Sequence, residues 1–269
     1  TVVSGLVMAV LVGTVLLGGI KRIAVVAGKL VPFMALLYIS ATLLILITHA
    51  TDIPAAVVLV VDSAFNGAAA TGGFAGATLM LALRMGIARG IFSNEAGLGS
   101  APIAHAAAET NSPVRQGTIA MLGTFIDTLV ICTMTGLVLI VTGVWSGEPQ
   151  GAAMTLAAFT SALPFGDLLL SICVALFAFT TMLGWSYYGE RCAEFLLGPR
   201  VITPFRVLWV IGIFVGTQMS LELVWKMTDA LNGLMAIPNL IALIFLSPVV
   251  FKLTQEYFAD EAKLAQENT

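Results

Sequence analysis

Long apolar segments alternate with short polar ones along this chain. Residues 30–47 and 168–189 contain no charged side chain, and residues 116–145 contain only Asp127. These segments approach or exceed the roughly 20 apolar residues that a helix needs to cross a bilayer. The pattern predicts an all-helical polytopic membrane protein, because the strands of a β-barrel would show short alternating segments instead.

The polar residues between the apolar segments place the expected helix ends. A loop is expected around Lys21, Arg22 and Lys29, and Pro32 falls in the first turn of the second span, where proline is tolerated. The expected helices are residues 3–20, 30–47, 53–65, 76–88, 113–142, 152–163, 167–197, 205–219 and 221–252, the last interrupted near Asn232, Gly233 and Pro238. One transmembrane domain over residues 1–252 and a charged, polar tail over residues 253–269 follow from this division.

The composition supports the same class of protein. Only 10% of the 269 residues are charged and 59% are hydrophobic, with a mean hydropathy of +1.01. A soluble domain carries about 25% charged residues. The net charge of −3 and the lack of a basic tract give no indication of a nucleic-acid partner. Because Cys132, Cys173 and Cys192 are far apart, they are expected to be small buried residues rather than a disulfide or metal set.

The distribution of lysine and arginine predicts the orientation in the membrane. If the segment with Lys21 is cytoplasmic, the spans alternate so that nine of the twelve basic residues fall on the cytoplasmic side, and the C-terminus is cytoplasmic too. These nine are Lys21, Arg22, Lys29, Arg115, Arg191, Arg200, Arg206, Lys252 and Lys263. The alternation requires residues 52–109 to make a single net crossing. The chain also begins within an apolar segment, at Thr1, and we therefore expect it to be part of a longer protein.

A polar, glycine-rich strip interrupts the crossing segment. As one helix, residues 76–109 would be about 51 Å long, which exceeds a hydrocarbon core of about 30 Å. Gly97, Gly99 and Pro102 weaken helix, and Ser93 and Asn94 can cap a helix that follows. We therefore expect two half-helices joined by an unwound strip over residues 92–100.

Unwound backbone within a membrane indicates a site for polar solutes. Unpaired main-chain groups cost several kcal/mol each in lipid and are tolerated beside a polar cavity. The start of the second half-helix would favour a carboxylate, and the end of the first would present carbonyl groups to a cation. This division is typical of secondary transporters. The alternative is an ordinary loop between two complete helices.

Three stretches of the sequence carry a family resemblance. They are RGIFSNEAGLGSAPIAHAAAET from Arg89, GGIKRIAVVAGKLVPFMALLY from Gly18 and QGTIAMLGTFIDTLVICT from Gln116. Together they resemble the alanine/glycine:cation symporter family, in order and spacing, from Gly18 to about Tyr188. The resemblance implies sodium- or proton-coupled symport of small neutral amino acids such as alanine and glycine by alternating access, in the plasma (inner) membrane.

The resemblance also implies a fold. Members are expected to adopt the inverted-repeat bundle of the leucine transporter, with five core helices plus five. On that mapping this chain holds the fourth to tenth core helices, with residues 76–109 as the broken sixth. The first broken core helix, which would supply the other half of the site, is expected to lie in a missing N-terminal part of the protein.

Candidate site residues fall into three groups. The expected substrate contacts are Phe92, Ser93, Asn94, Gly97 and Gly99. The expected ligands of the coupling ion are Thr180 and Thr181, by resemblance to the sodium site of the fold, and, as a weaker candidate, Asp127. Because hard cations prefer oxygen ligands, these side chains suit sodium. A threonine in a membrane helix can equally bond to its own helix, and Asp127 can bond to a neighbouring one.

The charged pair Arg89 and Glu95 is the third group. A carboxylate at membrane depth is costly and therefore indicates a function or a partner. Glu95 is expected to balance Arg89, to hold a cation or to accept a proton. Asp229 and Asn232 are weaker candidates of the same kind. No organic cofactor is expected.

Two other classes of protein remain as alternatives. An ion channel would show repeated pore motifs or rings of charge, and these are not visible in the sequence. A membrane-embedded enzyme or assembly factor would be expected to carry a nucleophile with a base, a metal-ligand spacing or a phosphate loop, and we find none of these.

Overall fold

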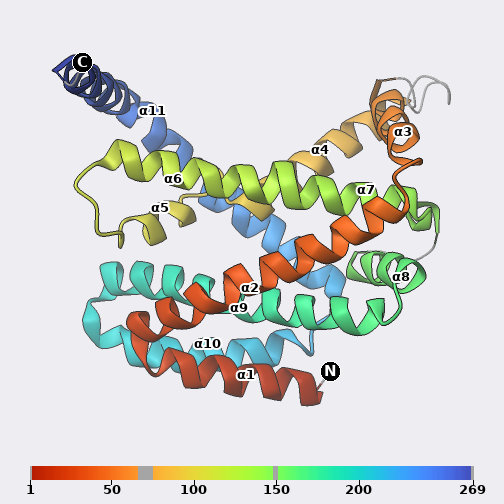
Figure 1. Ribbon diagram of the computed structural model, residues 1–269. Coiled ribbons are helices and arrows are strands. Elements are labelled where there is room, and N and C mark those ends of the chain that lie inside the picture. The colour runs from red at the N-terminus through yellow and green to blue at the C-terminus, as the bar shows by residue number, and fades with distance from the viewer. Residues whose placement is uncertain (1, 66–74, 148–150, 268–269) are drawn as a thin grey trace. The chain divides into compact units, whose positions relative to one another are not determined.

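The chain is helical in the computed structural model, which describes residues 2–65, 75–147 and 151–267 (Figure 1). The α-helices are α1 Val2–Leu16, α2 Gly19–Thr48, α3 Ile53–Phe65, α4 Ala75–Asn94, α5 Ser100–His105, α6 Pro113–Phe125, α7 Thr133–Val141, α8 Ala152–Ala162, α9 Gly166–Leu197, α10 Ile202–Gly216 and α11 Leu221–Glu267. A π-helical segment, η2 (Ile126–Cys132), joins α6 to α7, and short 3-10 turns precede α8 and α10.

Several helix ends lie where the sequence places them. Helix α3 spans the predicted residues, and α9 and α8 agree within a residue at each end. The start of α6 has a clear cause, since the hydroxyl of Ser112 accepts a hydrogen bond from the amide of Arg115 and Pro113 occupies the first turn. The start of α6 is thus fixed by local capping, which can be detected in the sequence.

The expected loop between the first two spans is wrong. Helix α1 ends at Leu16, and after a turn at Leu17 and Gly18, α2 begins at Gly19, which has φ +69°, and includes Lys21 and Lys29. Pro32 therefore lies inside the helix and not in its first turn. At 1.5 Å per residue the 30 residues of α2 extend about 45 Å, so the charged first turns can project beyond a core of about 30 Å.

The expected interruption of the last span is also wrong. Helix α11 continues past Asn232, Gly233 and Pro238, and through the residues expected to form a polar tail. A glycine costs a helix only about 1 kcal/mol, and a proline is tolerated in membrane helices where its surroundings satisfy the freed backbone group.

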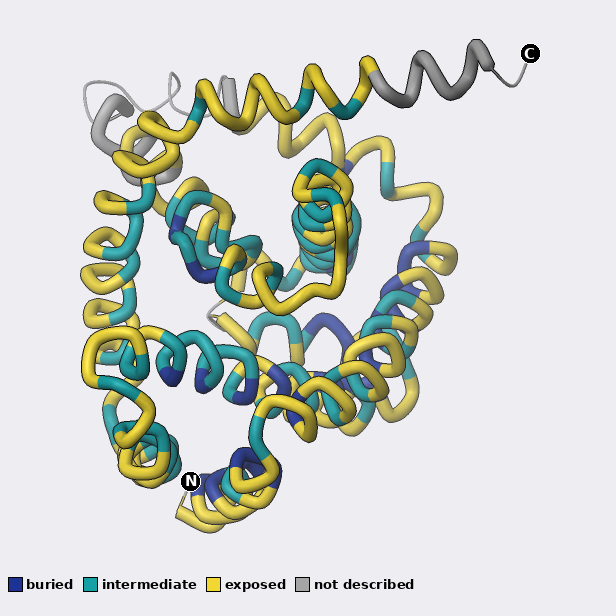
Figure 2. Tube along the Cα trace, turned by 90° about the vertical axis from the view of Figure 1, so that its left-hand side faces the viewer, coloured by how far each residue is buried: buried dark blue, intermediate teal, exposed yellow. Residues whose placement is uncertain are grey.

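Five of the described helical stretches are long and apolar enough to cross a membrane. They are Gly19–Thr48, Pro113–Val141, Gly166–Leu197, Pro199–Gly216 and Leu221–Ala259. Large apolar side chains are exposed on most helices. Figure 2 shows exposed residues along much of the helical trace. Soluble monomers rarely expose apolar surface on this scale. The predicted class, an all-helical polytopic membrane protein, is confirmed.

The chain divides into two compact units. Unit 1 comprises Thr1–Gly86 and Leu129–Met219, and its core has two clusters of buried residues. In the first, α2, α7, α8 and α9 pack around Phe159, with Tyr38 stacked on it at 5.8 Å between ring centroids. In the second, α1 packs on α10 and on α9 around Leu16 and Leu183.

A buried ion pair joins α9 to α10 within unit 1. The side chain of Glu190 is 4% exposed, and Arg206 donates to both of its carboxylate oxygens, from Nε at 2.6 Å and from Nη2 at 3.0 Å. Arg191 donates a third hydrogen bond at 3.2 Å. Paired donors of this kind suit arginine because the guanidinium fork matches a carboxylate. The pair therefore holds α9 and α10 together, near the ends that the sequence predicts to be cytoplasmic.

Unit 2 comprises Ile87–Thr128 and Ser220–Thr269. It contains the end of α4, the helices α5 and α6, the start of η2, and α11. The whole polar strip that the sequence singles out, residues 92–100, lies in this unit, together with side chains that bond to it.

Candidate functional site

The break after α4 is shorter than predicted. Helix α4 continues through Asn94, and the non-helical strip is Glu95–Gly99 rather than residues 92–100. Three of its residues adopt left-handed backbone, Glu95 at φ +57°, Gly97 at φ +80° and Gly99 at φ +83°. The first, third and fifth residues of the strip are thus left-handed, and two of these three are glycines, which adopt positive φ without steric strain.

Two further expectations about the break are wrong. Ser93 and Asn94 do not cap α5, because its N-cap position is occupied by Gly99, which has no side chain to bond there. The second half-helix is also short, since α5 ends at His105 and does not reach Glu109. The two side chains at the end of α4 bond elsewhere instead.

Glu95 has an unusual backbone and a specific partner. A non-glycine residue with positive φ is uncommon and is often found at functional sites. The hydroxyl of Ser100, which is 1% exposed, donates to Oε2 of Glu95 at 2.8 Å. The amide of Glu95 donates to the carbonyl of Ile91, and its carbonyl accepts from Leu98. The carboxylate therefore links Glu95, the first residue of the strip, to Ser100, the first residue of α5.

The expected pairing of Arg89 with Glu95 is wrong. Arg89 forms its ion pair with Asp229 of α11, and its guanidinium lies 4.2 Å from the ring of Trp225. Phe92 packs edge-on against the same ring, at 5.7 Å between centroids. Because α4 remains helical to Asn94, residues six apart face about 120° away from each other and cannot meet.

Ser93 and Asn94 bond to consecutive residues of η2. Oγ of Ser93 lies 2.9 and 2.8 Å from the two carboxylate oxygens of Asp127. Nδ2 of Asn94 donates to Oγ1 of Thr128 at 3.0 Å, and Oδ1 of Asn94 accepts from the amide of Ala96 at 2.9 Å. Of the two roles that the sequence leaves open for Asp127, the hydrogen bond to a neighbouring segment is present, and the cation remains a prediction.

Asn239 of α11 supports the strip from the other side. Its Nδ2 donates to the carbonyl of Gly97 at 3.0 Å. A Cβ at Gly99 would lie 3.1 Å from the carboxamide of Asn239, which is closer than normal van der Waals contact. Glycine at this position is therefore required both by its positive φ and by the approach of α11.

The residues expected to bind the coupling ion are not all in one unit. Thr180 and Thr181 lie on α9 in unit 1, whereas Asp127 lies in unit 2. The hydroxyl of Thr180 is buried and donates toward the carbonyl groups of Leu176, at 2.9 Å, and Phe177, at 3.1 Å. Thr181 is exposed. The hydrogen bond within the helix is thus present for Thr180. A cation would bind to the lone pairs of the Thr180 hydroxyl oxygen, which this donated bond does not use.

Three contributors to this region are missed by sequence reasoning. Thr128, Trp225 and Asn239 bond to or pack on the end of α4 and the strip, and each is far from it in sequence. Thr128 could have been found from its position beside Asp127. Nothing in the local sequence marks Trp225 or Asn239 as partners.

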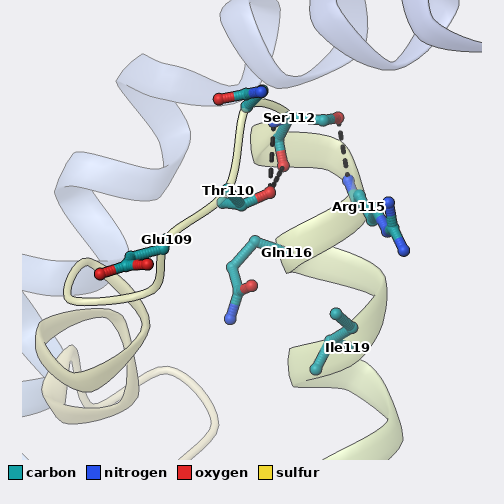
Figure 3. Close-up of a pocket in the computed structure, with 7 residues that line it drawn as sticks. Glu109, Thr110, Ser112, Arg115, Gln116 and Ile119 are labelled. Carbon is teal, nitrogen blue, oxygen red and sulfur yellow. Dashed lines mark hydrogen bonds between the residues drawn. The ribbon is translucent and has the colours of Figure 1, made fainter.

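A separate hollow lies before α6, in the segment that follows α5. It has a volume of about 410 Å³ and is lined by polar residues of the turn and by the first two turns of α6 (Figure 3). There Ser112 accepts from the amide of Arg115, and its own amide donates to Thr110. Nearby, Nε2 of Gln116 lies 2.8 Å from Nδ1 of His105.

Among the described residues, no group of three or more His, Cys, Asp or Glu side chains could hold a metal ion.

An all-helical membrane protein with a broken segment lined by small and polar residues is the class that this geometry defines. The whole chain, residues 1–269, matches the sodium:alanine symporter family, and it belongs to that family.

Curated relatives match over most of the chain. A protein of Haemophilus influenzae named as an uncharacterized transporter is 49% identical over 259 residues, covering 95% of this chain and 57% of that protein. The sodium/alanine symporter AgcS of Methanococcus maripaludis is 47% identical, with 95% and 56% covered. The probable sodium/glutamine symporter GlnT of Bacillus subtilis is 39% identical, with 94% and 53% covered. The chain therefore spans a little over half the length of these relatives.

Proposed function

We propose that the full-length protein couples the movement of sodium to the uptake of small neutral amino acids, alanine and glycine first among them. Membership of the sodium:alanine symporter family supports cation-coupled symport. The names of two relatives, a sodium/alanine symporter and a probable sodium/glutamine symporter, support sodium as the ion and an amino acid as the solute.

The observation that carries the proposal is the strip Glu95–Gly99. Its main chain has three left-handed residues within five, and two are glycines. Irregular backbone within a membrane protein is tolerated where it is buried in protein or lines a polar cavity. Gly97 and Gly99 have no side chain of their own. Because the carbonyl of Gly97 already accepts from Asn239, the proposed contacts for a small solute are the other main-chain amide and carbonyl groups at these two glycines.

The substrate site then divides into contacts and supports. Gly97 and Gly99 are the proposed main-chain contacts. Phe92 would form an apolar wall, since it already packs on Trp225. Ser93 and Asn94 would stand at the edge of the site, because their side chains already bond to η2. A site built from main-chain groups between such side chains suits a solute as small as alanine.

The coupling ion is the next part of the proposal. Thr180 and Thr181, in unit 1, would offer hydroxyl oxygens to sodium. Asp127, in unit 2, is a separate and weaker candidate that would offer a carboxylate. A proton is the alternative ion, with Asp127 or Glu95 as its acceptor, and one relative of Bacillus subtilis is named as a putative sodium/proton-dependent alanine carrier. Substituting lithium or a pH gradient for sodium in a transport assay separates these ions.

The surrounding architecture is proposed to be a five-plus-five inverted repeat, in which this chain supplies core helices four to ten. The first broken core helix would lie in a part of the protein outside this chain and complete the substrate site. The protein would lie in the plasma (inner) membrane with its C-terminus in the cytoplasm, as the lysine and arginine pattern favours.

Counterflow tests the proposal. The full-length protein is reconstituted into proteoliposomes loaded with unlabelled alanine, and labelled alanine is added outside with or without sodium. Sodium-dependent accumulation that saturates, and that glycine inhibits, supports symport. An ion current with no saturable alanine uptake would show a channel and contradict the proposal.

A further inference from the structure

Two consecutive residues of η2 meet two consecutive residues at the end of α4. Asp127 faces Ser93, and Thr128 faces Asn94, at hydrogen-bonding distances of 2.8 to 3.0 Å. The segment that presents them is a π-helix, a rare element that often marks a functional site. All four residues belong to unit 2. The contact therefore belongs to the same compact unit as the strip that follows Asn94.

The carboxamide of Asn94 is held at both ends. Its Nδ2 donates to Oγ1 of Thr128, and its Oδ1 accepts from the amide of Ala96, the second residue after it. A carboxamide with one bond alone can rotate or reverse. With both bonds it has one orientation, and the direction of the main chain at the start of the strip is set with it.

The hydroxyl of Thr128 connects this carboxamide to a negative charge. It accepts from Nδ2 of Asn94 and donates to Oδ2 of Asp127 at 3.3 Å. A hydroxyl has one proton and two lone pairs, so both bonds can form together. Because the chain of bonds ends on a carboxylate, each bond polarises the next. A valine in place of Thr128 has the same shape but can make neither bond.

We infer that Thr128 is a positioning residue for the transport site, and that it acts through the carboxamide of Asn94 rather than by touching the solute. The inference rests on the proposed function, because the strip that Asn94 orients is the proposed substrate site. It also assigns a specific part to Thr128, which the substrate and ion groups predicted from the sequence do not include. Removing the hydroxyl should weaken alanine binding while leaving the fold and the turnover step nearly intact.

The test compares four forms of the full-length protein in proteoliposomes: wild type, Thr128→Val, Thr128→Ser and Thr118→Val. Thr118 is the matched control, since it lies on α6 and its hydroxyl donates to the carbonyl of Arg115 in the same helix at 2.8 Å. Sodium-driven uptake of labelled alanine gives the apparent KM and the maximal rate of each. For Thr128→Val the apparent KM should rise about three- to tenfold, as for the loss of a neutral hydrogen bond.

The other forms separate positioning from a general structural effect. Thr128→Ser, which keeps the hydroxyl, should restore the wild-type KM within about twofold, and Thr118→Val should leave it unchanged. Thermal unfolding in detergent adds a second readout, because alanine should raise the Tm of Thr128→Val less than that of wild type at the same concentration. If the valine form does not fold, Thr128→Ala against Thr128→Ser is judged by the same criterion.

Three outcomes would overturn the inference while leaving the proposed function in place. They are an unchanged KM in Thr128→Val, an equal rise in Thr128→Ser, and an equal rise in Thr118→Val. Failure of the proposed function is a different result, since wild-type protein would then show no sodium-driven alanine uptake at all.

Discussion

Truncating Glu190 should destabilise the α9–α10 pair of helices more than any exposed charge would. Its carboxylate accepts from Arg206 at 2.6 and 3.0 Å, and its side chain is 4% exposed, so Glu190→Ala leaves a guanidinium with no counter-charge. Breaking a buried pair in this way costs about 3–5 kcal/mol. The side chain of Arg206 is 21% exposed and can be partly solvated, which places the expected loss near the lower figure, about 3 kcal/mol.

The assay is thermal or denaturant unfolding of the purified protein in detergent. A loss of about 3 kcal/mol corresponds to a Tm lower by about 6–12 °C for a chain of this size. The control is Glu222→Ala, which removes the exposed ion pair with Lys226, where the side chains are 78% and 73% exposed. An exposed pair contributes at most about 1 kcal/mol, so the control should unfold close to wild type.

The double variant Glu190→Met with Arg206→Met separates the cost of an orphaned charge from the contribution of the pair. Replacing both partners with apolar residues is often nearly neutral, so the double variant should recover most of the stability that Glu190→Ala loses. A Glu190→Ala protein within about 0.5 kcal/mol of wild type would refute the reasoning. So would a double variant that is no more stable than the single one.

Three further predictions concern the candidate site and the coupling ion. Gly99→Ala should lower the free energy of unfolding by about 1–2 kcal/mol and reduce alanine uptake, since it combines a positive φ with a Cβ 3.1 Å from Asn239; wild-type uptake would contradict this. Asp229→Asn should destabilise by about 0.5–1 kcal/mol, because Arg89 loses its counter-charge at a site where both side chains are partly exposed; an unchanged Tm in detergent would argue against a structural role for the pair. Thr181→Val should raise the sodium concentration for half-maximal uptake several-fold, and an unchanged sodium dependence would remove this residue from the proposed ion site.

The sequence predicts the class of the fold and the helix ends that depend on local chemistry. Low charge and long apolar runs are sufficient for the membrane class, and the Ser112 cap with Pro113 is sufficient for the start of α6. It fails where a helix continues past residues that disfavour helix, which is tolerated for a glycine at a cost of about 1 kcal/mol and for a proline whose freed backbone group is satisfied by its surroundings. Gly233 and Pro238 are of this kind, and α11 passes through both.

The candidate site is predicted in place but not in detail. The strip is visible as glycines and polar residues in an apolar chain, yet its limits depend on bonds that no local pattern shows. Asn94 remains helical while its carboxamide bonds to Thr128, 34 residues away in sequence. The partner of Arg89 lies 140 residues away, on α11. Contacts of this range follow from packing, which a single sequence does not reveal.

The most direct measurement of the central claim is sodium-driven alanine uptake by the full-length protein and its Asn94→Leu variant. Leucine removes both bonds of the carboxamide, to Thr128 and to the amide of Ala96. Wild-type proteoliposomes should accumulate labelled alanine when sodium is higher outside, and the variant should fold but accumulate none. Wild-type uptake in a folded Asn94→Leu protein would show that the strip after α4 is not the transport site.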